Sequence, residues 1–187
     1  AWYLHPDIGG NLSNVAMAAE YSAYRHRLAD DTLESLNVIR DCINEYENLT
    51  GRPQPGLIEA SGPENSEVYL LSMGSMAAEM EIVASELTKQ GISTSALKLR
   101  LYRPFPSDEL INVLPAGSTL VVLDRNIAYG HPGGVLYMEA RSALYGSDKN
   151  IKIVGGSVGL GGVDLTVSVL LKEVHRLLKS STGRSQE

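Results

Sequence analysis

Residues 118–134 read Ser-Thr-Leu-Val-Val-Leu-Asp-Arg-Asn-Ile-Ala-Tyr-Gly-His-Pro-Gly-Gly and give the clearest indication of the fold. Leu120 to Leu123 form an apolar run without alternation, which predicts a strand covered on both faces at the centre of a parallel sheet. Glycines and a proline then precede an amphipathic segment from Val135 to Leu144, so a strand, an irregular loop and a helix follow one another. Loops beyond the carboxyl ends of such strands are where ligands and partner surfaces meet the fold.

The same strand-then-helix pattern recurs on both sides of this stretch. Helices with one apolar face follow the strands, and the last of them ends near Lys179. The alternation predicts a parallel or largely parallel sheet with helices on both faces and right-handed crossovers. A short apolar patch, Leu57-Ile58, lies among prolines and glycines and predicts one brief strand at the sheet edge. The other expected strands are Glu67–Met73, Thr94–Leu101 and Ile151–Val154.

The residues before this domain are expected to be helical in part. Asn11 and Ser13 could cap a helix that begins near Asn14. From Thr32 to Leu49, apolar residues recur every three or four positions, which predicts an amphipathic helix that ends before Gly51. Cys42 lies within this helix, where a small buried thiol is expected rather than a reactive one.

Composition narrows the functional classes. The chain has 187 residues, of which 43% are hydrophobic and 20% charged, as expected for one globular domain with an appendage. A net charge of -6 argues against nucleic-acid and anionic membrane surfaces. No apolar run is long enough to span a bilayer, and no basic-then-apolar leader is present, so we expect a cytoplasmic protein. The first residue is Ala1, which indicates a piece of something longer.

Two groups of residues could carry chemistry, and each has a plainer interpretation. Asp124, Arg125 and His131 could act as an acid, a charge clamp and a base, but an adjacent Asp-Arg pair at a strand end more often forms an ion pair or caps backbone groups. The loop Gly155–Gly162 could present backbone N–H groups to a phosphate. It lacks the P-loop and dinucleotide patterns, which favours a structural turn or a contact with another domain.

Other signals are weaker. Arg103-Pro104-Phe105-Pro106 leaves a strand and could aim one guanidinium, or it could simply end the strand with a buried Phe105. The four histidines lack metal-ligand spacing, and no G-x-S-x-G elbow is present. Cys42 is the only cysteine, and one thiol can neither ligate an iron-sulfur cluster nor form an internal disulfide.

Five motifs follow one another along the chain. They are Gly51-Arg52, Glu67 to Ser75 with its Met-Gly-Ser, Arg103 to Pro106, Val122 to Asn126 with the trailing Gly130 and Gly133-Gly134, and Gly155 to Asp164. In this order they resemble the α subunit of pyruvate:ferredoxin oxidoreductase and related 2-oxoacid:ferredoxin oxidoreductases. The likeness covers most of the chain from about Thr32 onward and matches the second domain of that subunit, which is similar to the carboxy-terminal domain of transketolase.

The resemblance implies a three-layer α/β/α fold around a mostly parallel five-stranded sheet with one antiparallel edge strand. It also implies three parts of the chain. Residues 1–55 would be a linker with amphipathic helices that joins a preceding domain, residues 56–180 the transketolase-like domain, and residues 181–187 a frayed tail. Leu57-Ile58 would supply the fifth strand.

The family oxidatively decarboxylates a 2-oxoacid, here expected to be pyruvate, on thiamine diphosphate. It passes electrons through iron-sulfur clusters to ferredoxin and transfers the acyl group to coenzyme A. For the whole complex the resemblance implies thiamine diphosphate, magnesium, iron-sulfur clusters and coenzyme A. For this chain it implies none of them, since the chain has no cluster cysteines and no thiamine diphosphate metal motif, and no catalytic residue can be assigned.

The expected role is therefore a scaffold or interface domain of an oligomeric oxidoreductase, with the other subunits or domains as partners and ferredoxin reached through the complex. The alternative is a free-standing regulatory module that binds a small anion through Gly155–Gly162 or through the loop from Asp124 to Gly134. The residues expected at the interface are Arg103, Asp124, Arg125, Asn126, Gly130, His131, Gly133 and Gly134.

Overall fold

A computed structural model describes Asp7 and residues 17–182 of the chain. The chain divides into two compact units, and the division falls between Cys42 and Ile43 within the first helix, α1 (Ala18–Thr50). The helix start expected near Asn14 and most of the expected tail lie outside the described residues. Among the helices of residues 17–182, none is long and apolar enough to cross a membrane.

The helix α1 is 33 residues long and starts 14 residues earlier than the sequence pattern indicated, and none of its residues is buried. Thr32 looked like a helix start, but its hydroxyl instead donates to the Leu28 carbonyl at 2.6 Å, within the helix. This backward hydrogen bond is the one by which threonine is tolerated inside a helix. Cys42 is exposed, so the expectation of a buried thiol was wrong. Cys42 lies between Ile39 and Ile43 in the sequence, but it does not lie on the helix face that these two isoleucines share.

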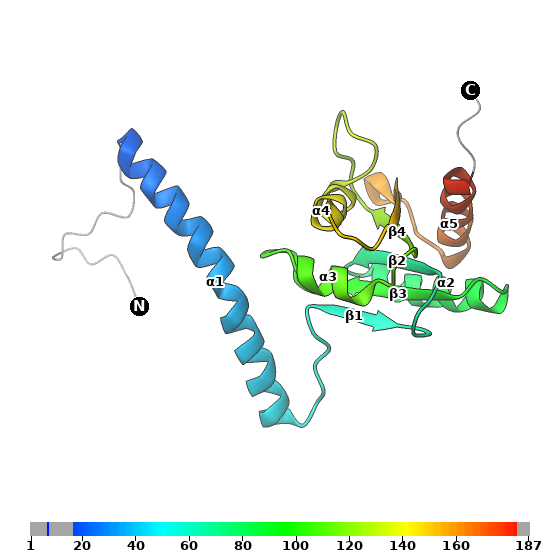
Figure 1. Ribbon diagram of the computed structural model, residues 1–187, viewed down its shortest axis with the longest axis horizontal. Helices are drawn as coiled ribbons and strands as arrows, with labels where there is room; N and C mark the ends of the chain where they lie inside the picture. Colours follow the sequence, from blue (N-terminus) through cyan, green and yellow to red (C-terminus); the bar gives the residue numbers. More distant parts are fainter. Residues whose placement is uncertain (1–6, 8–16, 183–187) are drawn as a thin grey trace. The chain divides into compact units, whose positions relative to one another are not determined.

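The second unit is built on one five-stranded sheet with the order β1-β3-β2-β4-β5 (Figure 1). The strand β1 pairs with β3 in antiparallel register, while β2, β3, β4 and β5 are parallel to their neighbours. This confirms the predicted mostly parallel sheet with one antiparallel edge strand. The strands are β1 (Ile58–Ser61), β2 (Val68–Met73), β3 (Thr94–Leu99), β4 (Thr119–Asp124) and β5 (Lys152–Ser157).

Helices cover both faces of the sheet and make three layers. Leu70 and Leu123 point into a core shared with α2 and α5, whereas Leu71 and Val122 point into a second core shared with α3 and α4. Successive strand residues face opposite sides, so the continuous apolar runs fill both cores. The connecting helices are α2 (Met76–Lys89), α3 (Ser107–Val113), α4 (Val135–Leu144), the short 3₁₀ turn η1 (Leu160–Gly162) and α5 (Val167–Thr182).

The glycines of β5 mark close packing rather than a loop. The sequence pattern ended this strand at Val154, but β5 continues through Gly155 and Gly156. A Cβ atom on Gly155 would lie 2.4 Å from the Tyr137 ring of α4, and one on Gly156 would lie 2.8 Å from the Glu173 carboxylate of α5. Each helix therefore approaches β5 where a glycine leaves room for it.

Candidate functional site

The carboxyl ends of β4 and β5 carry two neighbouring loops, residues 125–134 and 158–166, which we call the crest. The backbone N–H of Val158 donates to the carbonyl of Asp124 at 2.8 Å, so the two loops leave the sheet together. The Arg125 side chain then lies beside Gly159, where a Cβ atom would be 3.2 Å from Nε. The loop between β4 and α4 stands out from this unit as a yellow-green arch (Figure 1).

Asp124 ends β4 and is the best-buried polar group of the crest region, with 1% of its surface exposed. Its Oδ1 accepts from the backbone N–H of Leu136 and its Oδ2 from that of Tyr137, both at 3.0 Å. The Asn126 amide donates to Oδ1 at 3.2 Å. Burial raises the pKa of the Asp124 carboxyl, although these three hydrogen bonds act in the opposite direction.

Asp124 and Asn126 together cap the start of α4. The Asn126 side-chain oxygen accepts from the backbone N–H of Val135 at 2.9 Å, next to the two N–H groups that Asp124 holds. The first N–H groups of a helix have no partner within it, so side-chain acceptors here replace water. Gly134 allows the arrangement, because a Cβ atom at this position would lie 2.3 Å from Asp124. The capping alternative for Asp124 is thus confirmed.

His131 is not arranged as a base for Asp124. Within the described part of the chain no hydrogen bond joins the two side chains, and the Asp124 oxygens already hold the groups at the start of α4. The His131 ring lies beside the Tyr137 ring, with 6.2 Å between the centroids. Its Nδ1 is buried and has no hydrogen-bond partner among the described residues. Asp124, Arg125 and His131 therefore do not form a catalytic arrangement of acid, clamp and base in this structure.

The arch is closed by its own backbone. The N–H of Ala128 donates to the Gly133 carbonyl, and the N–H of His131 donates to the Ala128 carbonyl, both at 3.0 Å. Gly130 and Gly133 adopt positive φ angles of 77° and 116°, a conformation that glycine reaches without steric strain. The turn holds Tyr129 at its tip, where 97% of the surface of this residue is exposed.

Sequence reasoning missed the apolar side chains of the crest. Exposed apolar residues that gather on neighbouring loops indicate an interaction surface. The signal was available as Ile-Ala-Tyr within a glycine-rich loop, where a purely structural turn would favour small polar residues. The residues are Ile127, Tyr129, Leu160 and Val163, with exposed fractions of 46%, 97%, 39% and 63%.

Arg103 is held by Tyr102 and by Glu139 of α4. It forms an ion pair with Glu139 of α4, and its guanidinium carbon lies 4.3 Å from the centroid of the Tyr102 ring. Phe105 is partly buried and meets Tyr102 edge-on, with 6.4 Å between centroids. The Arg103-Pro104-Phe105-Pro106 segment thus fastens the end of β3 to the α3 and α4 layer.

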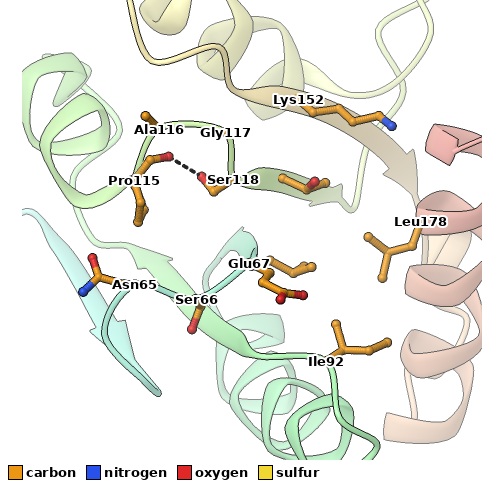
Figure 2. Close-up of a pocket in the computed structure, with 12 residues that line it drawn as sticks. Asn65, Ser66, Glu67, Ile92, Pro115, Ala116, Gly117, Ser118, Lys152 and Leu178 are labelled. Atoms are coloured by element: carbon orange, nitrogen blue, oxygen red, sulfur yellow. Dashed lines mark hydrogen bonds between the residues drawn. The ribbon is translucent and has the colours of Figure 1, made fainter.

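A cavity of about 580 Å³ opens at the opposite, amino edge of the parallel strands (Figure 2). Ile92 before β3 and Leu178 of α5 lie on one side of it, and the loop before β4 lies on another. The Ser118 hydroxyl donates to the Pro115 carbonyl at 2.8 Å, and the Ser66 hydroxyl donates to the Pro63 carbonyl at 2.8 Å. These hydroxyls fasten the loops that lead into β4 and β2, so we assign the cavity no chemistry.

The residues present do not fit the cofactors that the sequence resemblance implies for a whole oxidoreductase. Among the described residues, no three His, Cys, Asp or Glu side chains come together to hold a metal ion. The whole chain has one cysteine, and iron-sulfur clusters are held by several cysteine thiolates. The start of α4, the natural place for a diphosphate in such a fold, is filled by Asp124 and Asn126.

Comparison with known proteins identifies the chain's family. The family described as "Pyruvate:ferredoxin oxidoreductase core domain II" matches residues 66–170, which is more than half of the chain. Over 169 residues the chain is 34% identical to the ketoisovalerate oxidoreductase subunit VorA of Pyrococcus abyssi, covering 89% of this chain and 42% of the relative. It is 28% identical to the pyruvate synthase subunit PorA of Methanosarcina barkeri, covering 94% of this chain and 44% of that subunit.

One solved structure supports the fold. A 2-oxoglutarate:ferredoxin oxidoreductase from Magnetococcus marinus superposes with a TM-score of 0.50 at 18% identity, over 71% of this chain and 21% of that one. The chain spans less than half the length of the curated relatives named above. The resemblance predicted from the five motifs is therefore confirmed, and the chain belongs to the family of pyruvate:ferredoxin oxidoreductase core domain II.

Proposed function

We propose that this chain is a scaffold and interface domain of the α subunit of a thiamine-diphosphate-dependent 2-oxoacid:ferredoxin oxidoreductase. The observation that carries the proposal is the family match over residues 66–170, together with relatives that are subunits of a ketoisovalerate oxidoreductase and of a pyruvate synthase. The substrate class of the complex is a 2-oxoacid, and pyruvate is the substrate to test first. The remaining subunits are the direct partners, ferredoxin is reached through the complex, and the assembly is oligomeric.

The reactive groups of this complex would lie outside the chain. Thiamine diphosphate with magnesium would supply the carbanion chemistry, iron-sulfur clusters would carry the electrons and coenzyme A would take the acyl group. This chain offers one cysteine, Cys42, which is exposed. An exposed unpaired thiol suits a reducing compartment, which supports a cytoplasmic location.

The crest is the proposed contact surface, and the residues in it and at its base divide into three groups. Asp124, Asn126, Gly133 and Gly134 shape the loop and the start of α4, so their role is to hold the surface in place. Arg125 is exposed and forms no ion pair with the described residues, so its guanidinium is available to a partner. Gly130 and His131 form the turn that presents the tip of the arch.

The sheet and the family match support the proposed division of the chain. Residues 56–180 contain the whole sheet and its helices except the last two residues of α5, and the family match falls within this range. Residues 1–55, with α1, would form the connection to a preceding domain, because α1 has no buried residue of its own. A helix with no buried residue needs another surface to cover its apolar side chains.

The alternative, a regulatory module for a small anion, loses most of its support at the crest. The backbone N–H groups at the start of α4 are held by Asp124 and Asn126, and Gly155 and Gly156 belong to a strand. What remains is the turn at Gly159 with Arg125 beside it. Calorimetry with thiamine diphosphate, coenzyme A and inorganic phosphate separates the two functions, since the scaffold function predicts no tight binding by the chain alone.

Association with the other subunits tests the scaffold function directly. The chain is mixed with the remaining subunits of the 2-oxoacid:ferredoxin oxidoreductase from the same organism, purified without it, and the mixture is followed by sedimentation velocity. We expect a faster complex that contains all the chains in fixed proportion. Sedimentation of every component at its own rate, at concentrations up to tens of micromolar, would overturn the proposal.

A further inference from the structure

The arch of the crest carries an aromatic anchor that the fold does not use. Tyr129 is 97% exposed, although tyrosine ordinarily buries much of its ring. The turn that presents it is closed by the Ala128-to-Gly133 and His131-to-Ala128 backbone hydrogen bonds, each 3.0 Å long. A side chain on such a closed turn loses little backbone freedom when it is bound, which is the advantage of a preorganised contact.

The crest combines exposed apolar side chains with one exposed arginine. Ile127 on the same arch as Tyr129 and Leu160 and Val163 on the neighbouring loop are all exposed. Arg125 begins the arch and forms no ion pair with the described residues, whereas Arg103 is already paired with Glu139. Tyrosine and arginine are the residue types that most often dominate binding energy at the centre of an interface.

We propose, resting on the proposed function, that Tyr129 and Arg125 are the anchor pair by which this chain holds another subunit of the oxidoreductase. The tyrosine ring enters an aliphatic pocket of that subunit, and its hydroxyl donates to an acceptor at the pocket floor. The Arg125 guanidinium pairs with a carboxylate on the pocket rim, where it can make two parallel hydrogen bonds. Asp124 and Asn126 position the arch by fixing the start of α4 and do not touch the partner.

A second copy of this chain is the less suitable occupant. Most homodimers are twofold symmetric, so the same patch meets itself. A symmetric contact centred on the arch would bring Arg125 near its own counterpart, because the arch carries no acid and the one acidic residue of the crest, Asp164, lies on the other loop. The charge of the arch instead fits a different subunit that presents a carboxylate.

The chain supplies its own control for this proposal. Tyr145 follows α4, on the side of the amino ends of the parallel strands, whereas Tyr129 lies beyond their carboxyl ends. Tyr145 is 92% exposed. Tyr129→Ala and Tyr145→Ala therefore remove the same side chain from equally exposed positions. Both variants should unfold at the urea midpoint of the wild type, because neither ring packs against the fold.

The test is the dissociation constant of the whole chain for the remaining subunits, measured with immobilised subunits purified without it. We expect Tyr129→Ala to weaken binding roughly 30-fold or more, and Tyr145→Ala less than about 2-fold. Tyr129→Phe should keep most of the affinity, since the ring fills the pocket. Equal affinities of the Tyr129→Ala and Tyr145→Ala variants would overturn the anchor while leaving the scaffold function in place.

Two further outcomes are decisive. If the wild-type chain does not bind the subunits at all, both the anchor and the scaffold function are overturned. If the wild-type chain associates with itself and Tyr129→Ala abolishes that association, a second copy is the occupant and the proposed partner is wrong.

Discussion

The backbone N–H of Tyr137 lies 3.0 Å from Oδ2 of Asp124, and this hydrogen bond joins the start of α4 to the end of the central strand β4. The Tyr137 ring, on the same residue, covers Gly155 of the next strand. One residue thus ties α4 to both strands from which the crest arises. The exposed crest loops therefore start from a rigid base, and a precise contact surface requires such a base.

Replacing Asp124 with Asn should destabilise the fold. The carboxylate accepts from Leu136 and Tyr137 on two different oxygens, whereas an amide has a single oxygen, and its nitrogen would face a backbone donor. A buried donor without an acceptor costs about 1–3 kcal/mol. Urea denaturation should show Asp124→Asn less stable by this amount, with an unchanged m-value. A midpoint equal to that of the wild type would show that the cap contributes nothing.

The same pair of proteins gives a pH dependence. Burial raises the pKa of the folded-state Asp124 carboxyl above its ordinary value of 3.8, so the folded chain holds this proton more tightly than the unfolded chain. Stability from this group is present in full below the ordinary pKa and is lost as pH rises through the folded-state pKa. Because burial favours the neutral carboxyl, the wild type should exceed Asp124→Asn most at low pH.

Unfolding free energies of both proteins, measured from pH 3.5 to 8 in urea, check this direction. Subtracting the unfolding free energy of Asp124→Asn from that of the wild type cancels the contribution of groups that titrate in the same way in both proteins. A difference that instead grows with rising pH would mean that the hydrogen bonds to Asp124 outweigh its burial.

Gly155→Ala should be markedly destabilising although alanine suits a strand better than glycine. Its Cβ would lie 2.4 Å from the Tyr137 ring, which is closer than carbon atoms approach without displacement. Overpacking of this kind costs roughly 1–3 kcal/mol. Gly56→Ala is the matched control, because a Cβ atom there has nothing within 4 Å. Thermal melts of the two variants should differ clearly, and equal melting temperatures would contradict the close approach of α4 to β5.

Arg125→Ala should weaken association more than it weakens folding. The side chain is exposed and forms no ion pair with the described residues, so its removal should change the unfolding free energy by less than about 0.5 kcal/mol. Lys89→Ala also removes one positive charge, at the carboxyl end of α2, and serves as the control. Sedimentation with the other subunits should be altered by the first substitution only. An unchanged sedimentation profile together with a large loss of thermal stability would show the opposite role for Arg125.

Cys42 should react with a colorimetric thiol reagent in the folded protein. The thiol is exposed on α1, so the rate in buffer should be within about tenfold of the rate in denaturant. Protection by several orders of magnitude would mean that Cys42 is covered. Protection that appears only when the remaining subunits are added would instead place α1 at an interface.

The arrangement of the sheet could be predicted from the sequence because burial leaves a simple pattern. Strands covered on both faces have continuous apolar runs, and β2 and β4 show them at Val68 to Leu71 and at Leu120 to Leu123. The edge strand β1 was found from only two apolar residues, since its position among prolines and glycines allowed nothing longer.

What sequence alone could not give depends on contacts between distant residues. Gly155 and Gly156 looked like a loop because the rings and helices that require glycine there, Tyr137 among them, are far away in the chain. Asp124 looked like a candidate acid because its partners are backbone groups of residues twelve and thirteen positions later. The exposure of Tyr129 is likewise a property of the folded turn, and the residue type alone suggests burial.

The most direct test of the scaffold function is turnover by the rebuilt complex. The remaining subunits, purified without this chain, are titrated with it, and pyruvate-dependent reduction of a viologen dye is recorded in the presence of coenzyme A. We expect no reduction by the chain alone and a rate that rises with added chain until the complex is saturated. Turnover by the chain alone, or no increase with pyruvate, 2-ketoisovalerate or 2-oxoglutarate, would contradict it.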